Sequence, residues 1–191
     1  LKWYFKDNIT SKLKSGIKNL INIKKPLETF LWPLLVIDTK VGFGYIMPLK
    51  NNQFRSLVDW VLRKFDMDIH LLVKARYSLV DSFHCLHSKG LSYQDISLNN
   101  IFINKDTGDI AIVDNDNVVT NGMSNGDVLG TMEFMAPEIV IGEKLIPDSN
   151  SDRYSLAVLL FHLLIVGHPL EGKLETNIKC KDLPAKRKLY G

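Results

Sequence analysis

The chain has 191 residues, of which 46% are hydrophobic and 24% are charged. This composition is ordinary for a globular protein, and the sequence holds neither an internal repeat nor a low-complexity tract. The formal charge of +3 is mild, so it indicates neither a nucleic-acid partner nor a membrane partner. The two cysteines, Cys85 and Cys180, lack zinc-ligand spacing, and we expect a reducing, cytoplasmic location.

A helix and two strands are predicted in the first third of the chain. Thr10 or Ser11 is placed to cap a helix, because either hydroxyl can accept a hydrogen bond from the first helical turn. One face of this helix carries the apolar residues Leu13, Ile17, Leu20 and Ile21. The apolar and aromatic runs 30–37 and 42–47 then have the length and composition of strands.

Three more helices are predicted further along the chain. The first covers 54–65, and the second covers 68–88 and ends at the Lys-Gly pair 89–90. The third runs over 153–166 and ends at Gly167; it is too short to span a bilayer. The apolar stripe of the second helix consists of Leu72, Ala75 or Tyr77, Leu79, Val80, Phe83 and Leu86.

A hairpin is predicted between the second and third of these helices. The apolar runs 101–103 and 110–113 flank a Gly-containing turn at 105–109. Such a hairpin places Asn100 just before one strand and Asp114 at the end of the other, close enough to share one ion. An Asp-rich loop is also a common solvated turn, so Asp114 alone does not distinguish the two interpretations.

Asp95 supplies a second carboxylate, and its spacing in the sequence from Asn100 and Asp114 is informative. It precedes Asn100 by five residues, and Asp114 closes the second apolar run. Phosphoryl transfer needs positioning and charge neutralisation more than covalent help. A carboxylate such as Asp95 suits the place beside an incoming hydroxyl, and the oxygens of Asn100 and Asp114 suit Mg²⁺.

Three motifs in register resemble the eukaryotic-type Ser/Thr protein kinase family. They lie at 92–100, 112–116 and 130–138, and resemble the catalytic loop, the metal-binding turn and the end of the activation segment. The Asp-Asn-Asp-Asn at 114–117 and the Gly-His-Pro-Leu-Glu-Gly at 167–172 are similar to a divergent bacterial branch of this family.

The resemblance implies an α+β, two-lobed kinase fold. Residues 1–50 are expected to form a truncated, β-rich small lobe, with its third strand at 1–5, the regulatory helix, two further strands and the hinge. Residues 51–191 are expected to form a mostly helical large lobe that is incomplete at its C-terminal end. The stretch 121–127 resembles the activation loop, and the basic tail 173–188 is expected to be a solvated linker or helix face.

The resemblance also implies roles for single residues. Asp95 would be the catalytic base, and Thr131 would bond to it. Asn100 and Asp114 would hold Mg²⁺ and with it ATP, whose α- and β-phosphates Lys2 would contact.

The hinge and the third helix complete the implied site. ATP would bind the hinge backbone around Met47, Leu49 and Lys50. Asp152 resembles a buried Asp that accepts hydrogen bonds from the catalytic-loop backbone, and it also fits a plain N-cap. The expected substrate is a protein hydroxyl on Ser or Thr, and a regulatory partner is compatible with the fold.

One departure from the family pattern concerns Lys2. The regulatory helix normally presents a Glu to this lysine, but residues 9–26 contain no acid. Asn19 or Asn22 would be a weak substitute. The ion pair that marks the active state of the family is therefore in question.

Other departures lie in the motifs themselves, and no Gly-rich phosphate loop is present. Gln94 replaces an Arg that pairs with an activation-segment phosphate, and Asp116 replaces a flexible Gly. Ser97 occupies a catalytic position where Ser/Thr kinases carry a Lys. Losing that cation costs several kcal/mol of transition-state stabilisation, about two or three decades in rate.

Three functions fit these features. The leading hypothesis is an ATP- and Mg²⁺-dependent protein Ser/Thr kinase. The second is a pseudokinase that acts as a nucleotide-binding or partner-binding module, which the departures favour. The third is a small-molecule kinase, although such enzymes typically lack the Ala-Pro-Glu segment found at 136–138.

Overall fold

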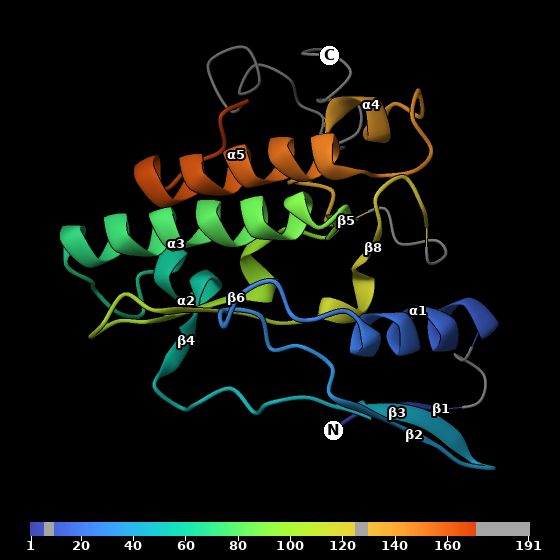
Figure 1. The fold of residues 1–191 in the computed structure, drawn as a ribbon. Coiled ribbons are helices and arrows are strands. Elements are labelled where there is room, and N and C mark those ends of the chain that lie inside the picture. Colours follow the sequence, from blue (N-terminus) through green and yellow to red (C-terminus); the bar gives the residue numbers. More distant parts are fainter. Residues whose placement is uncertain (6–9, 125–129, 171–191) are drawn as a thin grey trace.

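Figure 1 shows the computed structural model of the chain, which describes residues 1–5, 10–124 and 130–170. The helices are α1 (Ser11–Asn22), α2 (Leu57–Val61), α3 (Ile69–Ser88), α4 (Pro137–Val140) and α5 (Ser149–Ile165), with the 3-10 turns η2 (Leu98–Asn100) and η3 (Asn115–Asn117). The strands are β1 (Lys2–Phe5), β2 (Leu35–Asp38), β3 (Gly42–Ile46), β4 (Phe54–Ser56), β5 (Leu91–Ser92), β6 (Ile101–Asn104), β7 (Ile110–Ile112) and β8 (Val119–Thr120). The predictions for 125–127, for 171–172 and for the basic tail with Cys180 lie outside the described residues.

The first sheet has the strand order β1-β3-β2, with both pairs antiparallel, and lies below α1 in Figure 1. The strands predicted at 1–5 and 42–47 are confirmed as β1 and β3. Lys2 lies opposite Tyr45 in the register. Gly44 permits the close pairing, because a Cβ atom there would lie 2.6 Å from the Lys2 carbonyl oxygen. The sheet thus brings Lys2 and Tyr45 side by side.

Helix α1 begins where the sequence predicts. The Thr10 hydroxyl accepts a hydrogen bond from the Leu13 backbone N–H at 3.1 Å, which satisfies one donor of the first turn. On the face toward the sheet, Ile17 is fully buried against Phe43 and Tyr45. Apolar packing therefore joins the helix to the first sheet.

Only the second half of the predicted strand 30–37 is a strand of the first sheet. Phe30 instead forms a parallel bridge with Ile112 at the end of β7, whereas β2 begins at Leu35. Pro33 lies between them and has no N–H to donate to a ladder. One apolar run is therefore divided between two sheets.

The helix predicted over 54–65 is confirmed only for its middle part, 57–61, and its predicted bounds are wrong. The first three residues of this range, 54–56, form strand β4, which pairs antiparallel with β6 and has Phe54 opposite Asn104. The helix that follows, α2, has five residues, with Ser56 as its N-cap and Arg63 in the left-handed region (φ 55°) just past its end. Strand pairing with a distant segment overrides the local helical pattern here.

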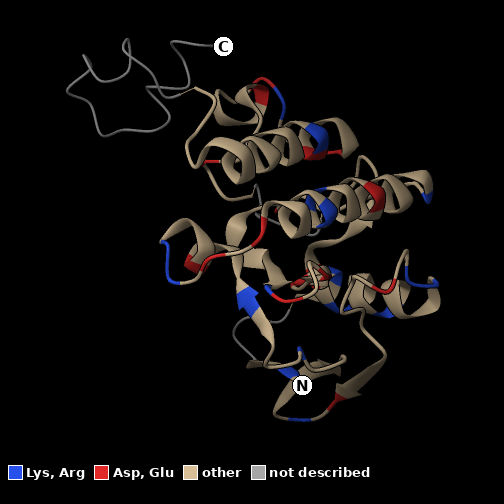
Figure 2. Ribbon diagram, turned by 90° about the vertical axis from the view of Figure 1, so that its left-hand side faces the viewer, with Lys and Arg blue, Asp and Glu red and all other residues tan. Residues whose placement is uncertain are grey.

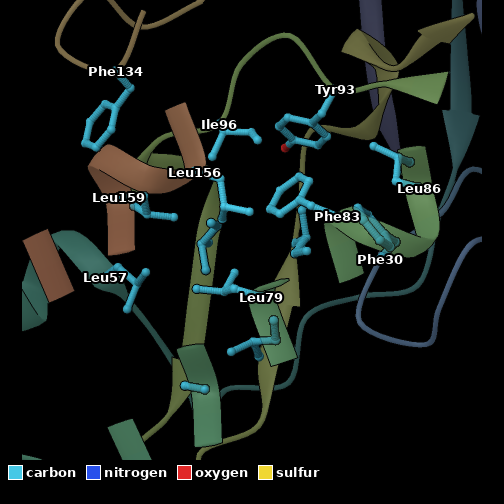
Figure 3. Packing of buried hydrophobic residues seen from close by; sticks show 14 of the residues in the cluster. Phe30, Leu57, Leu79, Phe83, Leu86, Tyr93, Ile96, Phe134, Leu156 and Leu159 are labelled. Atoms are coloured by element: carbon cyan, nitrogen blue, oxygen red, sulfur yellow. The ribbon is translucent and has the colours of Figure 1, made fainter. Parts of the chain in front are cut away.

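The main core lies where α3 passes between α5 and the β6–β7 hairpin (Figures 1 and 3). The hairpin forms as predicted, with Ile101 opposite Ile112. The ring of Phe83 packs edge-on against Tyr93, with 5.5 Å between centroids. The predicted helix 68–88 is confirmed, and the buried members of its stripe are Leu72, Ala75, Leu79, Phe83 and Leu86, whereas Tyr77 and Val80 are exposed.

Helix α5 begins four residues earlier than predicted. Its N-cap is Asp148, whose carboxylate accepts from the backbone N–H groups of Asn150 and Ser151 at 3.0 and 3.1 Å. Asp152 therefore lies inside the first turn, and its interpretation as an N-cap is wrong. At the other end, Val166 rather than Gly167 takes the left-handed conformation that ends the helix (φ 56°).

Because it lies inside the helix, Asp152 can reach the loop that follows β5. Its carboxylate accepts from the backbone N–H groups of Tyr93 at 2.6 Å and Gln94 at 2.8 Å. The ring of His87 on α3 lies 2.9 Å from the same carboxylate. Asp152 is 2% exposed, so these contacts replace the water that a buried carboxylate loses. The family-like role of Asp152 is thus present in the geometry.

Charged residues are mixed over the described helices and strands, as Figure 2 shows. Several lie in opposite-charge pairs, such as Lys14 with Asp38 and Lys74 with Asp109, each at 2.8 Å. Exposed pairs of this kind contribute little to stability. No helix within the described ranges is long and apolar enough to cross a membrane.

The Asp148 cap yields a stability prediction. Asp148→Ala should lower the free energy of unfolding by about 1–2 kcal/mol at pH 7, because two backbone donors lose their acceptor. Burial acts to raise the pKa of Asp148, but hydrogen bonds from Lys144 and Ser151 outweigh it and hold the pKa below its usual value. The carboxylate therefore stabilises the fold above its ordinary pKa of about 3.9 and ceases to do so as the pH falls through the lowered pKa.

Urea denaturation at pH 7 and in acid checks this prediction. The difference between the parent and Asp148→Ala should shrink in acid, and Asp148→Asn, which can still cap, should stay close to the parent at pH 7. Equal stability of the Ala variant and the parent at pH 7 would contradict it.

Asp152 yields a second stability prediction. Asp152→Asn should destabilise the protein by about 2–3 kcal/mol, because one amide oxygen cannot accept all the hydrogen bonds that two carboxylate oxygens accept. The matched control is Asp81→Asn on the exposed face of α3, where we expect a change within about 0.5 kcal/mol. Urea denaturation midpoints at pH 7 compare the two, and equal midpoints would refute the role given to Asp152.

Candidate active site

The centre of the site is Asp95, on the loop between β5 and η2. The Thr131 hydroxyl donates to one oxygen of its carboxylate at 2.7 Å. The side-chain amide of Asn100 donates to the other oxygen and to the Asp95 backbone carbonyl, both at 2.9 Å. Asp95 is only partly buried. The structure thus brings together three residues that the resemblance placed in the catalytic machinery.

The hairpin brings Asp114 next to this group. Asn100 immediately precedes β6, Asp114 follows β7 by two residues, and the backbone N–H of Val113 donates to the Asn100 carbonyl at 3.0 Å. Asp114 takes a left-handed conformation (φ 53°), which turns the chain sharply at that point. The Tyr93 hydroxyl also donates to the Val113 carbonyl, so the catalytic loop and the turn are joined on two sides.

The donor set fits a hard cation. Because the Asn100 amide nitrogen is already donating to Asp95, its oxygen is the atom left to act as a ligand. The Asp114 side chain is 44% exposed, so its carboxylate is accessible. An amide oxygen and a carboxylate oxygen are ligands that Mg²⁺ accepts. Within the described ranges no three His, Cys, Asp or Glu side chains gather into a metal cluster.

Lys2 reaches the site from β1. Its amine lies 3.3 Å from Asp114 and 2.9 Å from Asp116. Burial acts to lower the pKa of Lys2, but the charges and hydrogen bonds of Asp116 and Asp114 outweigh it, and the pKa is raised above its usual value. Lys2 is therefore a cation held beside the metal-type turn.

Asp116 receives more contacts than its position in the sequence suggested. Besides Lys2, the hydroxyls of Tyr45 and Tyr4 donate to its two carboxylate oxygens, that of Tyr45 at 3.1 Å. Burial first, and then the Asp116 charge, raise the pKa of both tyrosines, so they remain protonated donors at neutral pH. Lys2 and Tyr4 reach Asp116 from β1, and Tyr45 reaches it from β3.

The expected hinge residues make other contacts in the structure. Met47 is partly buried against the small cluster of Ile17, Phe43 and Tyr45. Leu49 is 95% exposed. The Lys50 amine donates to the Phe54 carbonyl at 2.9 Å.

The hinge backbone is nevertheless suited to a ligand. Within the described residues, the backbone of 48–50 forms no backbone–backbone hydrogen bond. Pro48 has no N–H, so a donor to a base must come from a neighbour. Hinge binding by Met47, Leu49 and Lys50 stays a prediction.

Ser97 lies next to the group through its backbone, because its carbonyl accepts a hydrogen bond from the Asn100 N–H at 3.3 Å, but its side chain does not take part. Its side chain is 0% exposed, and its hydroxyl has no hydrogen-bond partner among the described residues. A fully enclosed hydroxyl cannot replace the exposed cation that the family carries at this position. The catalytic role of Ser97 is left without support from the geometry.

Gln94 holds the following segment through neutral contacts. Its side-chain amide donates to the carbonyls of Met123 at 2.7 Å and Pro147 at 2.9 Å. The backbone carbonyl oxygen of Gln94 lies against Gly130, and a Cβ atom added at Gly130 would be 2.8 Å from this oxygen. At this position the family has an arginine that pairs with a phosphate. Gln94 instead forms direct hydrogen bonds to the neighbouring backbone.

Sequence reasoning treated Asp116 only as a residue that stiffens a hinge, and it missed the hydroxyls of Tyr4 and Tyr45. A signal was available, because an extra Asp two residues after Asp114 coincides with a regulatory helix that has no acid. Nothing local in the sequence, however, relates either tyrosine to residue 116, which lies 112 and 71 positions away respectively.

Comparisons with known proteins find serine/threonine kinases that are similar to this chain. The chain is 32% identical over 109 residues to serine/threonine-protein kinase pkn2 from Myxococcus xanthus, an alignment that covers 52% of this chain and 13% of that protein. It is 31% identical over 127 residues to protein kinase C delta type from Mus musculus, with 59% and 18% covered. It is 29% identical over 120 residues to serine/threonine-protein kinase ppk16 from Schizosaccharomyces pombe, with 61% and 18% covered.

The alignments thus span less than a fifth of the length of each of these relatives. A broader match covers nearly the whole chain, because residues 9–189 fit the protein kinase domain family. That range includes Asp95, Asn100, Asp114 and Thr131, which the fold gathers at one site. The chain belongs to the protein kinase domain family.

Proposed function

We propose that this chain is the catalytic part of a protein Ser/Thr kinase that transfers the γ-phosphate of ATP to a hydroxyl. The observation that carries the proposal is the placement of Asp95. One of its carboxylate oxygens contacts Thr131 and the other contacts Asn100, next to the turn that carries Asp114. A carboxylate held in this way can receive a proton from a hydroxyl beside it.

The residues present fit ATP and Mg²⁺. Asn100 and Asp114 would hold the cation, which when bound neutralises charge on the phosphates. Lys2 would contact the α- and β-phosphates, and the open backbone of 48–50 would bind adenine. Together these groups neutralise and orient a triphosphate, which is most of what phosphoryl transfer asks of a protein.

The transfer itself uses few side chains. The oxygen of the acceptor hydroxyl forms a bond to the γ-phosphorus, and Asp95 accepts the proton that this hydroxyl loses. The bond between that phosphorus and the β–γ bridging oxygen breaks, and ADP leaves. Thr131 and Asn100 keep the Asp95 carboxylate oriented, because each donates to a different one of its oxygens.

The choice of acceptor rests on the segment at 130–138. Met135 and Ala136 in it are buried and pack against α4, which begins at Pro137. An ordered segment next to Asp95 suits a peptide more than a small molecule. The relatives named for serine/threonine kinase activity support the same acceptor, so we propose a protein substrate.

A pseudokinase is the second candidate, and the burial of Ser97 favours it. With Ser97 enclosed, no cation from that position stabilises the transferring phosphoryl group.

The proposal also includes a cytoplasmic location, in keeping with the free Cys85. A boundary between two lobes near residue 50 belongs to the same proposal.

Asp95→Asn tests the proposed base. It should lower kcat for phosphorylation of a generic Ser/Thr protein acceptor by about 10²–10⁴-fold, since the amide cannot accept the proton. The affinity for Mg²⁺-ATP should change little. The matched control is Asp106→Asn in the exposed turn of the hairpin, which should keep full turnover. Turnover by Asp95→Asn equal to the parent's would disprove the assignment of the base.

Asp114→Asn tests the metal role separately. It should weaken nucleotide binding in the presence of Mg²⁺ by about tenfold or more, and have a smaller effect without Mg²⁺, because it removes a charged ligand. Asp109→Asn on the same hairpin, whose partner is Lys74, is the control. Equilibrium binding of a fluorescent ATP analogue supplies the measurement. Loss of affinity that does not depend on Mg²⁺ would rule out Asp114 as a metal ligand.

A further inference from the structure

The lysine of β1 has its acid partner in an unexpected part of the chain. Helix α1 contains neither Asp nor Glu, so it cannot offer a carboxylate to Lys2. The Lys2 amine instead donates to both oxygens of Asp116, at 3.0 and 2.9 Å. Asp116 belongs to η3, which packs against α1. The acid therefore comes from the turn that packs against the helix and not from the helix itself.

The two acids near Lys2 differ in their surroundings. The Asp116 side chain is 7% exposed and lies 2.9 Å from the amine, whereas the Asp114 side chain is 44% exposed and lies 3.3 Å away. Tyr4 and Tyr45 also donate to Asp116, which fixes its carboxylate in one orientation. The buried contact is thus the shorter one, and the exposed Asp114 is the acid that remains accessible.

The Lys2–Asp116 pair is partly buried, with the two side chains 31% and 7% exposed, so salt and water screen it less than an exposed pair. Removing one partner leaves the other charge uncompensated. Long lysine side chains have many rotamers, and a carboxylate that contacts the amine restricts them. The contacts to Asp116 therefore hold the Lys2 amine at one point beside Asp114.

We propose that Asp116 is the positioning residue for Lys2, in the role that the family resemblance gives to an acid of the regulatory helix. This inference rests on the proposed function, since Lys2 matters through its contact with nucleotide phosphates. Asp116 follows Asp114 by two residues. One short turn therefore carries the metal ligand and also positions the phosphate-binding lysine, and no acid of α1 is needed for either.

A double-mutant cycle on nucleotide binding tests this inference. Asp116→Asn and Lys2→Met are made singly and together, and the dissociation constant for Mg²⁺-ATP is measured by equilibrium binding. If Asp116 acts through Lys2, each single variant weakens binding by about tenfold, and the double variant is no weaker than Lys2→Met alone. A role confined to folding would instead make the two effects multiply.

Two further variants keep the test decisive. Asp38→Asn breaks another Lys–Asp contact, between Asp38 of β2 and Lys14 of α1, and should leave nucleotide affinity unchanged. If Asp116→Asn does not fold, as judged by circular dichroism, the cycle is run with Asp116→Gly, which restores the residue that the family has at this position. Unchanged affinity in the folded Asp116 variant, or multiplying effects in the double variant, would overturn the inference.

The same measurements separate this inference from the proposed function. A parent protein that binds Mg²⁺-ATP but phosphorylates no acceptor would overturn kinase activity, while the cycle on binding still decides the role of Asp116. A parent that phosphorylates its acceptor while the Asp116 variant binds nucleotide as well as the parent does would overturn the inference alone. A parent that does not bind nucleotide would overturn both.

Discussion

The geometry of the site depends on the hydrogen bonds that the buried carboxylate of Asp152 accepts. This carboxylate accepts two backbone N–H groups of the loop that carries Asp95, and it lies against His87 of α3. Without this acceptor, two buried donors would have no partner, and a loop without regular secondary structure would be free to move. Helix α5 thus contributes to the site through one side chain that never reaches the proposed substrate.

The position of the catalytic loop then determines the position of the metal-type turn. The Tyr93 hydroxyl and the Asn100 carbonyl both contact Val113, one residue before Asp114. On the other side of that turn, Asp116 receives Lys2 from β1. A continuous series of hydrogen bonds therefore leads from the helical core to the first sheet. Its contacts are buried or partly buried, and a low local dielectric strengthens such hydrogen bonds.

Departures from the family motifs have compensations that only contacts reveal. Gln94 replaces an arginine, and its amide bonds directly to two carbonyls of the neighbouring segments. Asp116 replaces a glycine and supplies Lys2 with an acid that α1 lacks. For Ser97 the described structure offers no compensation, because the hydroxyl is enclosed and unpaired there. The departures therefore differ in how much each bears on the proposed phosphate transfer.

Local patterns in the sequence were enough for the kinase-like family, the β6–β7 hairpin, helices α1 and α3 and the grouping of Asp95, Asn100 and Asp114. These features depend on short spacings, on side-chain periodicity and on hydrogen bonds between neighbouring residues. Tertiary structure decided what depends on distant partners. The segment 54–56 is a strand because β6 lies beside it. Lys2 pairs with Asp116 because the first sheet and η3 meet in the fold, which brings residues 114 positions apart into contact. No local spacing encodes such a contact, since it arises only when separate elements pack together.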